Sequence, residues 1–155
     1  MFFMKEPSTL EVVGDINNNI VNFYQTCKDS ELFPFLQKMV DATPYARELR
    51  QEARLVRRNS DVFSALKRAW AVWVLATLSF SANLGSGFSY DRKNNLVGKR
   101  FNNRKRDFGP RIMKRLENVC IENMDVLELI KSRDSEDTFF YVDPPYISES
   151  MGSKT

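Results

Sequence analysis

The residues best suited to chemistry lie together near the C-terminus, in the run Asp143, Pro144, Pro145 and Tyr146. The aspartate carboxylate and the backbone carbonyl of the next proline present two hydrogen-bond acceptors side by side. Such a pair suits a flat aromatic amine, because each of its two N–H groups can donate to one acceptor. Holding both hydrogens favours the pyramidal amine, whose lone pair is free to attack. The tyrosine ring can stack on the flat base, and the prolines keep the acceptors rigid.

The residues just before this run predict the element that positions it. Residues 138–142, TFFYV, form a continuous apolar and aromatic stretch, which is typical of a parallel strand buried on both faces. The two prolines end the strand because neither can donate a backbone hydrogen bond. Ligand sites of open α/β sheets lie in the crevice outside the carboxyl ends of the strands. We therefore expect Asp143 at such a crevice.

The composition excludes several classes of chemistry. The chain has no histidine, and its two cysteines, Cys27 and Cys120, lack metal-ligand spacing. This excludes histidine-based triads and general bases and most zinc sites, so we expect no metal. We expect both cysteines to be buried, reduced thiols of a cytoplasmic protein. No signal-peptide pattern is visible, and the most apolar stretch, residues 69–80, is shorter than the roughly 20 residues of a membrane span.

Positive charge is concentrated in one segment, residues 92–115, which we call the basic block. It holds ten basic residues and one acidic residue, a net charge of +9, so the other 131 residues carry −6. Such asymmetry indicates a surface that binds polyanions, with a solvated basic loop as the alternative. Residues 81–110 are rich in glycine and asparagine and predict a long irregular loop. Aromatic residues interleaved with the basic ones suit a contact with nucleic acid.

The two ends of the chain alternate between strand and helix patterns. Residues 9–15 predict a short parallel strand, and residues 17–28 place apolar side chains on one helix face behind asparagine cap candidates. Residues 119–121 predict a second strand, followed by a turn at 122–125 and a helix over 126–131. This alternation predicts parallel strands with helical crossovers.

The middle of the chain is predominantly helical. Residues 31–58 predict charged helices interrupted by prolines, and their arginines recur at spacings of three and four, so several share one helix face. A solvated face is the first interpretation of these arginines, and a phosphate contact is the second. Residues 60–80 predict the longest helix, with Ser60 as its cap and with Trp70 and Trp73 in the core.

These segments, in this order, resemble the Dam-like DNA adenine-N6 methyltransferases, which use S-adenosylmethionine, and in particular their phage and prophage members. DPPY at 143–146 resembles the catalytic motif, and EVVGDINNNIVNFYQ at 11–25 resembles the second strand with its acidic residue and following helix. TPYARE at 43–48 and LATLSFSANLGSGFSYD at 75–91 resemble the target-recognition insertion. ENMDVLELI at 122–130 completes the order.

The resemblance implies an α/β fold, a partial Rossmann-like methyltransferase sheet with an inserted helical target-recognition region. Residues 1–30 would form part of the cofactor-binding core, 31–115 the helical and basic insertion, and 116–155 the catalytic part of the core. The family's glycine-rich loop and the elements that follow DPPY have no counterpart in the sequence. We therefore expect a chain truncated at both ends, with a complementing chain that supplies the glycine-rich loop as a partner.

The resemblance also assigns cofactor contacts. Asp15 matches the acidic residue that binds the ribose hydroxyls of S-adenosylmethionine, and Ile16 lies beside it. A carboxylate can accept both hydroxyl donors, whereas a simple turn residue is the alternative. Asp125 matches an acidic position near the cofactor's adenine, and a helix N-cap is the alternative there.

The same resemblance assigns the catalytic and DNA contacts. Asp143 and the Pro144 carbonyl would hold the exocyclic amine of an adenine flipped out of double-stranded DNA, with Tyr146 stacked on its ring and Pro145 stiffening the turn. The basic block would contact backbone phosphates rather than read the sequence. Its candidate DNA-binding residues are Arg92, Lys93, Lys99, Arg100, Arg104, Lys105 and Arg106.

The function that this implies is site-specific methylation of adenine N6 in DNA, as in phage protection or restriction–modification. Two alternatives remain open from the sequence. One is a catalytically inactive DNA-binding fragment, and the other is half of a split methyltransferase.

Overall fold

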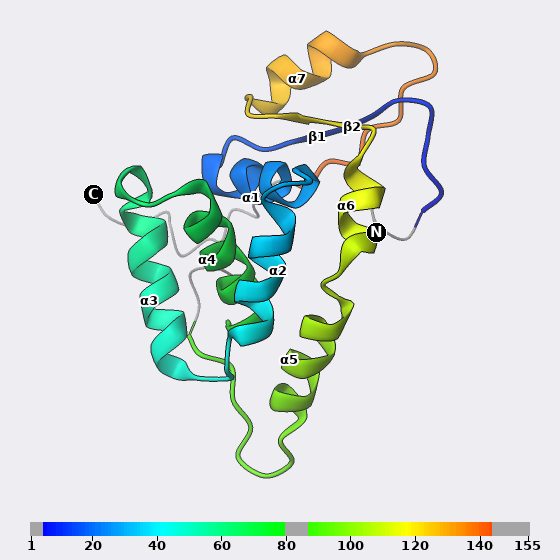
Figure 1. Ribbon diagram of the computed structural model, residues 1–155. Coiled ribbons are helices and arrows are strands. Elements are labelled where there is room, and N and C mark those ends of the chain that lie inside the picture. Colours follow the sequence, from blue (N-terminus) through cyan, green and yellow to red (C-terminus); the bar gives the residue numbers. More distant parts are fainter. Residues whose placement is uncertain (1–4, 80–86, 144–155) are drawn as a thin grey trace, which may run out of the picture.

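The structure, a computed structural model, describes residues 5–79 and 87–143 of the 155-residue chain. A small sheet lies at one end of the molecule and a helical body at the other (Figure 1). Within the described residues, no helix is long and apolar enough to cross a membrane. The elements are, in chain order, β1 (Glu11–Gly14), α1 (Asn18–Lys28), α2 (Phe33–Ala42), α3 (Arg47–Arg58), the 3-10 helix η2 (Ser60–Val62), α4 (Ala65–Leu78), α5 (Leu96–Asp107), α6 (Pro110–Leu116), β2 (Val119–Glu122) and α7 (Val126–Arg133).

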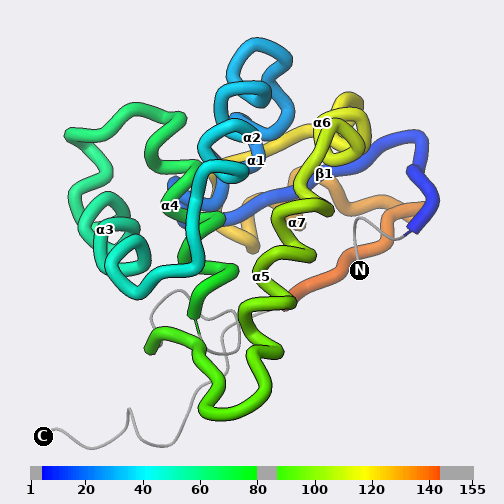
Figure 2. Tube along the Cα trace, turned by 60° about the horizontal axis from the view of Figure 1, so that its bottom comes forward, coloured from blue at the N-terminus to red at the C-terminus, as the bar shows by residue number. Residues whose placement is uncertain are grey.

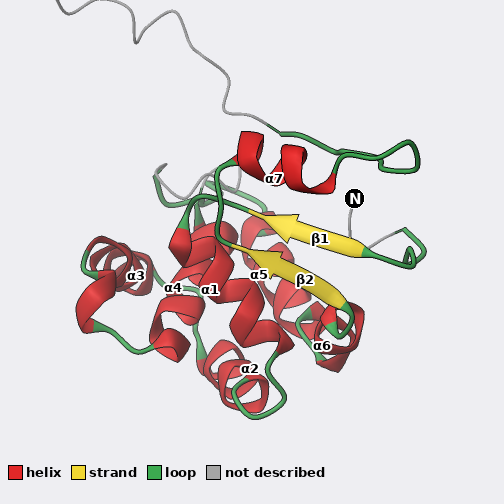
Figure 3. Ribbon diagram, turned by 90° about the horizontal axis from the view of Figure 1, so that it is seen from above, coloured by secondary structure: helices red, strands yellow, loops and turns green. Residues whose placement is uncertain are grey.

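The sheet consists of two parallel strands from opposite ends of the described chain. Glu11 lies opposite Val119, and the register continues to Gly14 opposite Glu122. Both predicted short strands are therefore confirmed, and their carboxyl ends meet at one edge of the sheet. Figure 3 shows the strands lying over the helical body, with α7 beside them on the other side. Leu129 of α7 fills the space that a Cβ at Gly14 would need, so the glycine allows this close approach.

Side-chain caps fix where three of the helices begin. The Asn17 side chain accepts a hydrogen bond from Asn19 N and begins α1, as predicted. The longest helix, α4, begins after Ser64, whose hydroxyl accepts a hydrogen bond from Lys67 N. The prediction of Ser60 as its cap is wrong, because Ser60 starts the separate 3-10 helix η2. A side-chain cap satisfies one of the backbone N–H groups that a helix start leaves without a partner.

The core lies in the helical body and is built around α4. Trp70 and Trp73 are 4% and 6% exposed, which confirms their predicted core positions. Trp73 packs edge-on against Phe101 and Phe108 at centroid distances of 5.7 and 6.1 Å. Trp70 Nε1 donates to Thr43 Oγ1 at 2.9 Å, which satisfies the indole donor inside the core. Aromatic packing thus joins α4 to α5 and to Phe108, the residue that directly follows α5.

The two cysteines differ in their surroundings. Cys27 is fully buried in the core, as predicted, and burial raises the pKa of its thiol to about 12. Cys120 in β2 is only half-buried, so the prediction of a buried thiol is wrong there. Both are free thiols in this structure.

The predicted long loop at 81–110 contains a helix instead. Helix α5 occupies most of its second half, although asparagine and glycine are poor helix formers. Burial of Phe101 against Trp73 explains this, because tertiary packing outweighs weak intrinsic propensity. The Asp91 carboxylate also accepts a hydrogen bond from Val97 N at 2.5 Å, in the first turn of α5. Residues 81–86 of the predicted loop lie outside the described residues.

The predicted buried strand at 138–142 is not formed. These residues follow α7 without regular secondary structure, and the Phe139 side chain is 88% exposed. Thr138 N donates to Ser135 O at 3.1 Å, and Thr138 Oγ1 donates to Arg133 O at 2.7 Å. A strand forms only where another strand pairs with it, and in the described residues β1 and β2 pair only with each other, which gives the physical reason for the difference. Among the described residues the fold is therefore mixed α/β, mostly helical, with a two-stranded parallel sheet.

Candidate functional site

Asp15 lies at the carboxyl end of β1, where the chain turns toward α1. Its backbone N–H donates to the Glu122 carbonyl at 3.2 Å, which extends the parallel pairing by one bond. Its carboxylate oxygen Oδ1 accepts a hydrogen bond from Asn17 N at 2.7 Å, which closes a tight turn. The side chain is half-buried. A carboxylate is thus held at the edge of the sheet where ligands of α/β proteins bind.

Asn123 is a site residue that the sequence analysis missed. It follows β2 directly, and its Nδ2 donates to the carbonyls of Asp15 at 2.9 Å and Ile16 at 3.1 Å. This amide ties the two strand ends together and fixes the backbone on which the Asp15 carboxylate sits. The available signal was its position immediately after a predicted parallel strand, since residues there share an edge with the end of the neighbouring strand.

Asp125 acts as a helix cap in this structure. Its Oδ1 accepts a hydrogen bond from Leu127 N at 2.8 Å, at the start of α7. The alternative interpretation of this aspartate as an N-cap is therefore confirmed. The exposed Asp125 lies two residues after Asn123, and its role in holding a cofactor stays a prediction.

The groups at this edge fit one end of a nucleoside. One oxygen of the Asp15 carboxylate is held by Asn17 N, and Oδ2 has no hydrogen-bond partner among the residues that the structure describes. Ribose hydroxyls donate readily to such a carboxylate oxygen. The neighbouring Ile16 side chain is 73% exposed and offers an apolar surface to a flat ring. The ribose end of S-adenosylmethionine is therefore compatible with the side chains present.

Two ion pairs stabilise the sheet, one at the carboxyl ends of the strands and one at their amino ends. Glu122 at the end of β2 pairs with Arg133 of α7 at 2.5 Å, and this bond is the main cause of the lowered pKa of the Glu122 carboxyl. Glu11 at the start of β1 accepts two bonds from the Arg115 guanidinium, at 2.5 and 2.8 Å. Hydrogen bonding to Arg115 lowers the pKa of Glu11 to about 2. These pairs attach β1 to α6 and β2 to α7.

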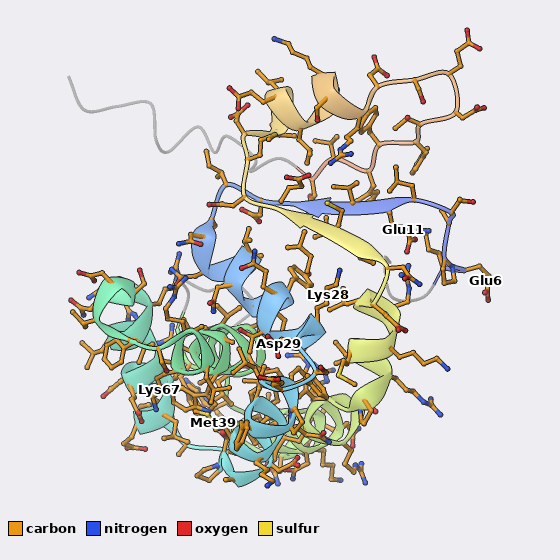
Figure 4. The ribbon with its side chains drawn as sticks, turned by 45° about the horizontal axis from the view of Figure 1, so that its top comes forward. Glu6, Glu11, Lys28, Asp29, Met39 and Lys67 are labelled. Carbon is orange, nitrogen blue, oxygen red and sulfur yellow. The ribbon has the colours of Figure 1, made fainter. Side chains whose placement is uncertain are left out.

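Figure 4 shows Glu11 at the start of β1 and Lys28 between α1 and β2. Lys28 Nζ donates to the Val119 carbonyl at 2.8 Å. The last residue of α1 thus holds the first residue of β2, and so helps to place the sheet over the helical body. Lys28 and Glu11 are structural contacts rather than groups for binding a ligand.

Asp143 is exposed and makes no hydrogen bond or ion pair with other residues in the described ranges. Pro144, Pro145 and Tyr146 lie outside the described residues. The structure therefore brings Asp15, Ile16 and Asn123 together at the sheet edge, without a direct bond from them to Asp143. The joint geometry of the DPPY run stays a prediction.

The candidate DNA-binding residues fall into two groups. Arg104 donates to the carbonyls of Ala76 and Thr77 at 3.2 and 3.4 Å, and Lys105 donates to those of Asp41 and Thr43 at 2.5 and 3.0 Å. Both cations thus stabilise the C-terminal ends of α4 and α2, where carbonyls are left unpaired. These two residues hold the helical body together.

Within the described residues, the other candidates in the basic block make no hydrogen bond of this kind to another helix. Arg106 bonds to the Asn103 side-chain oxygen within α5. The remaining four are exposed and have no hydrogen-bond or ion-pair partner in the described part of the chain. They are Arg92, Lys93, Lys99 and Arg100. Cations of this kind are available to phosphates.

Comparison with known proteins supplies the family. Searches of curated proteins and of solved structures found no significant match. A family model described as D12 class N6 adenine-specific DNA methyltransferase matches residues 2–155, nearly the whole chain. That span includes the sheet edge at Asp15, the helical body and the DPPY run. The chain therefore belongs to the D12 class of N6 adenine-specific DNA methyltransferases, a family with a Rossmann-like fold that acts on DNA with S-adenosylmethionine.

Proposed function

We propose that the chain is a site-specific DNA adenine-N6 methyltransferase, which transfers a methyl group from S-adenosylmethionine to an adenine flipped out of the duplex. The observation that carries this proposal is the family match over residues 2–155, which contains the run DPPY at 143–146. When bound, the cofactor supplies an electrophilic methyl group. The chain's own residues bind it, hold the target amine and place the DNA.

The sheet edge would hold the cofactor through Asp15. Its Oδ2, which has no partner within the described ranges, would accept the ribose hydroxyls. Asn123 would keep this carboxylate in place, because its side chain is bonded to the Asp15 and Ile16 carbonyls. Asp125 would lie close to the adenine ring of the cofactor as the cap of α7.

The DPPY run would hold the target base. The Asp143 carboxylate and the Pro144 carbonyl would each accept one hydrogen of the adenine amine, so that the N6 lone pair is free to attack the methyl group. As N6 gains positive charge in the transition state, the nearby carboxylate stabilises it electrostatically. Tyr146 would stack on the flipped base, and Pro145 would keep the turn rigid.

The exposed cations of the basic block would place the duplex. Arg92, Lys93, Lys99 and Arg100 would contact backbone phosphates, which fix orientation and carry no sequence information directly. Arg104, Lys105 and Arg106 were predicted to do the same. We propose that Arg104 and Lys105 contribute mainly by holding α5 against α4 and α2, since their donors are already engaged there.

Exposed apolar side chains around the catalytic segment favour a second candidate function. Phe139, Tyr141 and Val142 are 88%, 67% and 48% exposed just before Asp143. A complementing chain could cover them, and the protein would then be half of a split methyltransferase. A DNA-binding fragment without catalytic activity is the related alternative, in which no complementing chain is present. Phage protection and restriction–modification are the roles that we propose for an active enzyme.

The test is methyl transfer from labelled S-adenosylmethionine to an unmethylated duplex, followed by a search for labelled N6-methyladenine in the digest. Label should appear with the unaltered chain and disappear in Asp143→Ala. Asp137→Ala is the matched control, because Asp137 is an exposed aspartate of the same segment. Label that survives in Asp143→Ala would contradict the catalytic assignment. Duplex binding without label from the unaltered chain would favour the alternative.

A further inference from the structure

Five arginines of α3 lie on one side of the helix, which we call the arginine face. They cover about 100° of its circumference at 3.6 residues per turn. They are Arg47, Arg50, Arg54, Arg57 and Arg58. The two acidic residues of the helix, Glu48 and Glu52, lie outside this arc, and Glu52 pairs with Lys67 of α4 at 2.6 Å.

The charge of the arginine face is not balanced by ion pairs within the described part of the chain. Among the described residues, the four ion pairs involve Glu11, Glu52 and Glu122, and none involves an arginine of α3. Neighbouring like charges three and four residues apart repel one another and destabilise a helix. A row of five cations that forms no ion pair within the described residues is therefore suited to bind an external anion.

Arg50 gives an independent indication of a missing anionic partner. Its side chain is 5% exposed, and its Nε donates to Ser79 Oγ at 3.1 Å. Its Nη2, however, is buried and has no hydrogen-bond partner among the residues that the structure describes. Burial, together with the positive charges of Arg54 and Arg47, lowers the pKa of Arg50. An unsatisfied buried guanidinium donor is costly, and an anion at this place would satisfy it.

The arginine face adjoins the segment that leads to the basic block. The Arg47 guanidinium lies 4.9 Å from the Phe88 ring centroid and 5.5 Å from that of Tyr90. Both rings belong to the segment that continues to Arg92 and Lys93. Figures 1 and 2 agree that this segment lies between α3 and α5 at the same end of the helical body. The two basic regions thus form neighbouring parts of the molecule.

We propose that the arginine face is a second phosphate-binding surface, which holds the backbone of duplex DNA beside the part contacted by the basic block. From Arg47 to Arg58 the helix extends about 16 Å at 1.5 Å per residue. One DNA strand advances 3.4 Å per phosphate, so this length corresponds to about five phosphates. Guanidinium groups match phosphate oxygens with two parallel bonds, which suits a backbone clamp. The inference rests on the proposed function in taking DNA as the polyanion.

The test compares two double variants that remove the same charge. Arg54→Gln/Arg58→Gln alters the arginine face at two residues that have no hydrogen-bond partner in the described parts of the chain. Lys38→Gln/Lys131→Gln removes two exposed cations from α2 and α7 as the control. Binding of the full chain to a short fluorescent duplex is measured by anisotropy over a series of salt concentrations. Circular dichroism confirms that both variants are folded.

The arginine-face variant should bind about tenfold more weakly at low salt, and its plot of log K against log salt should be shallower by about two units. The lysine control should match the unaltered chain. Equal slopes for the arginine variant and the unaltered chain would overturn the inference. So would the same loss in the lysine control, because the effect would then come from net charge alone.

Two further arms separate this inference from the proposed function. Binding to a duplex RNA of the same sequence tests which polyanion the arginine face prefers. If the arginine-face variant lost affinity for RNA alone, that result would contradict a DNA clamp. Methyl transfer is measured on the same preparations. Transfer by the unaltered chain, with equal slopes for both proteins, would keep the methyltransferase and refute the arginine face. The predicted change of slope without methyl transfer would support the arginine face and contradict the methyltransferase. Failure of the unaltered chain to bind the duplex would refute the clamp.

Discussion

The helical body and the sheet end of the molecule differ sharply in how well they are packed. The body is built around Trp70, Trp73 and Phe101, which are at most 6% exposed. In α7, at the sheet end, no residue is buried, and Val126 and Leu127 are 47% and 64% exposed. Burial of apolar surface is the main source of stability, so most of it must come from the helical body.

This contrast also divides the proposed functions. Asp15, which would bind the cofactor, belongs to the sheet end, and Asp143, which would hold the target base, follows α7 in the chain. The groups that would hold the DNA backbone belong to α3, α5 and the segment between them. The helical body can therefore be stable by itself, whereas the sheet end adds polar contacts, such as Asn123 to Asp15 and Arg115 to Glu11, to the few apolar residues, such as Val119, that it buries in the core.

The largest expected effect is on the stability of the helical body. Trp73→Ala should lower the free energy of unfolding by about 3–5 kcal/mol, because it leaves a cavity between α4, Phe101 and Phe108. Urea denaturation followed by circular dichroism measures this loss. Val126→Ala on α7 is the comparison and should cost less than about 1 kcal/mol. A similar decrease in the free energy of unfolding for both variants would contradict the difference in packing between the two regions.

At the sheet end, Asp15→Asn should weaken binding of S-adenosylmethionine by roughly 10- to 100-fold. The hydrogen bonds to a charged carboxylate contribute about 1.5–3 kcal/mol each, and the neutral amide of asparagine keeps only part of this. Equilibrium dialysis with labelled cofactor gives the dissociation constant. The control is Asp61→Asn, which changes an exposed aspartate of η2 in the helical body. Unchanged affinity in Asp15→Asn would remove Asp15 from the cofactor site.

The bond between Glu11 and Arg115 predicts a particular dependence of stability on pH. The folded-state pKa of Glu11 is about 2, below the ordinary value of 4.5. A depressed pKa stabilises the fold above the unfolded-state pKa, and this contribution is lost as the pH falls from 4.5 toward 2. Glu11→Gln should therefore be less stable than the unaltered chain at neutral pH, and the difference should shrink across that interval. Urea titrations at a series of pH values measure it, and a difference that does not change with pH would be inconsistent with this role.

The smallest expected effect concerns the cap of α7. Asp125→Ala removes the acceptor for Leu127 N and should lower the free energy of unfolding by about 1 kcal/mol. Asp125→Ser, which retains a capping oxygen, should recover most of the loss. Cofactor affinity measured in parallel sharpens the assignment. A drop in affinity that Asp125→Ser does not restore would indicate a direct contact with the cofactor as well as a cap.

Much of the fold could be predicted from local patterns. The strands at the two ends, the helix behind Asn17 and the core tryptophans all follow from apolar spacing and cap chemistry. The cap of α4 was assigned to Ser60 rather than Ser64, because both serines precede the same helical pattern. Only the bond from Lys67 N to the Ser64 hydroxyl decides between them.

The wrong or missed structural predictions share one physical cause: the structure of each segment depends on contacts with residues far away in the sequence. The apolar run at 138–142 reads as a core strand, yet a strand forms only if another pairs with it. Helix α5 has weak propensity and forms because Phe101 meets Trp73. The role of Asn123 depends on the register of β1 against β2, which the sequence does not specify.

The most direct test of the account measures catalysis and DNA binding on one pair of proteins. The unaltered chain and Asp143→Ala are each assayed for N6-methyladenine formation and for binding to the same duplex. We expect Asp143→Ala to lose methyl transfer and to keep the duplex affinity and salt dependence of the unaltered chain. Loss of duplex binding together with transfer would contradict the division between the helical body and the sheet end. Transfer that persists in Asp143→Ala would contradict the catalytic role of the DPPY run itself.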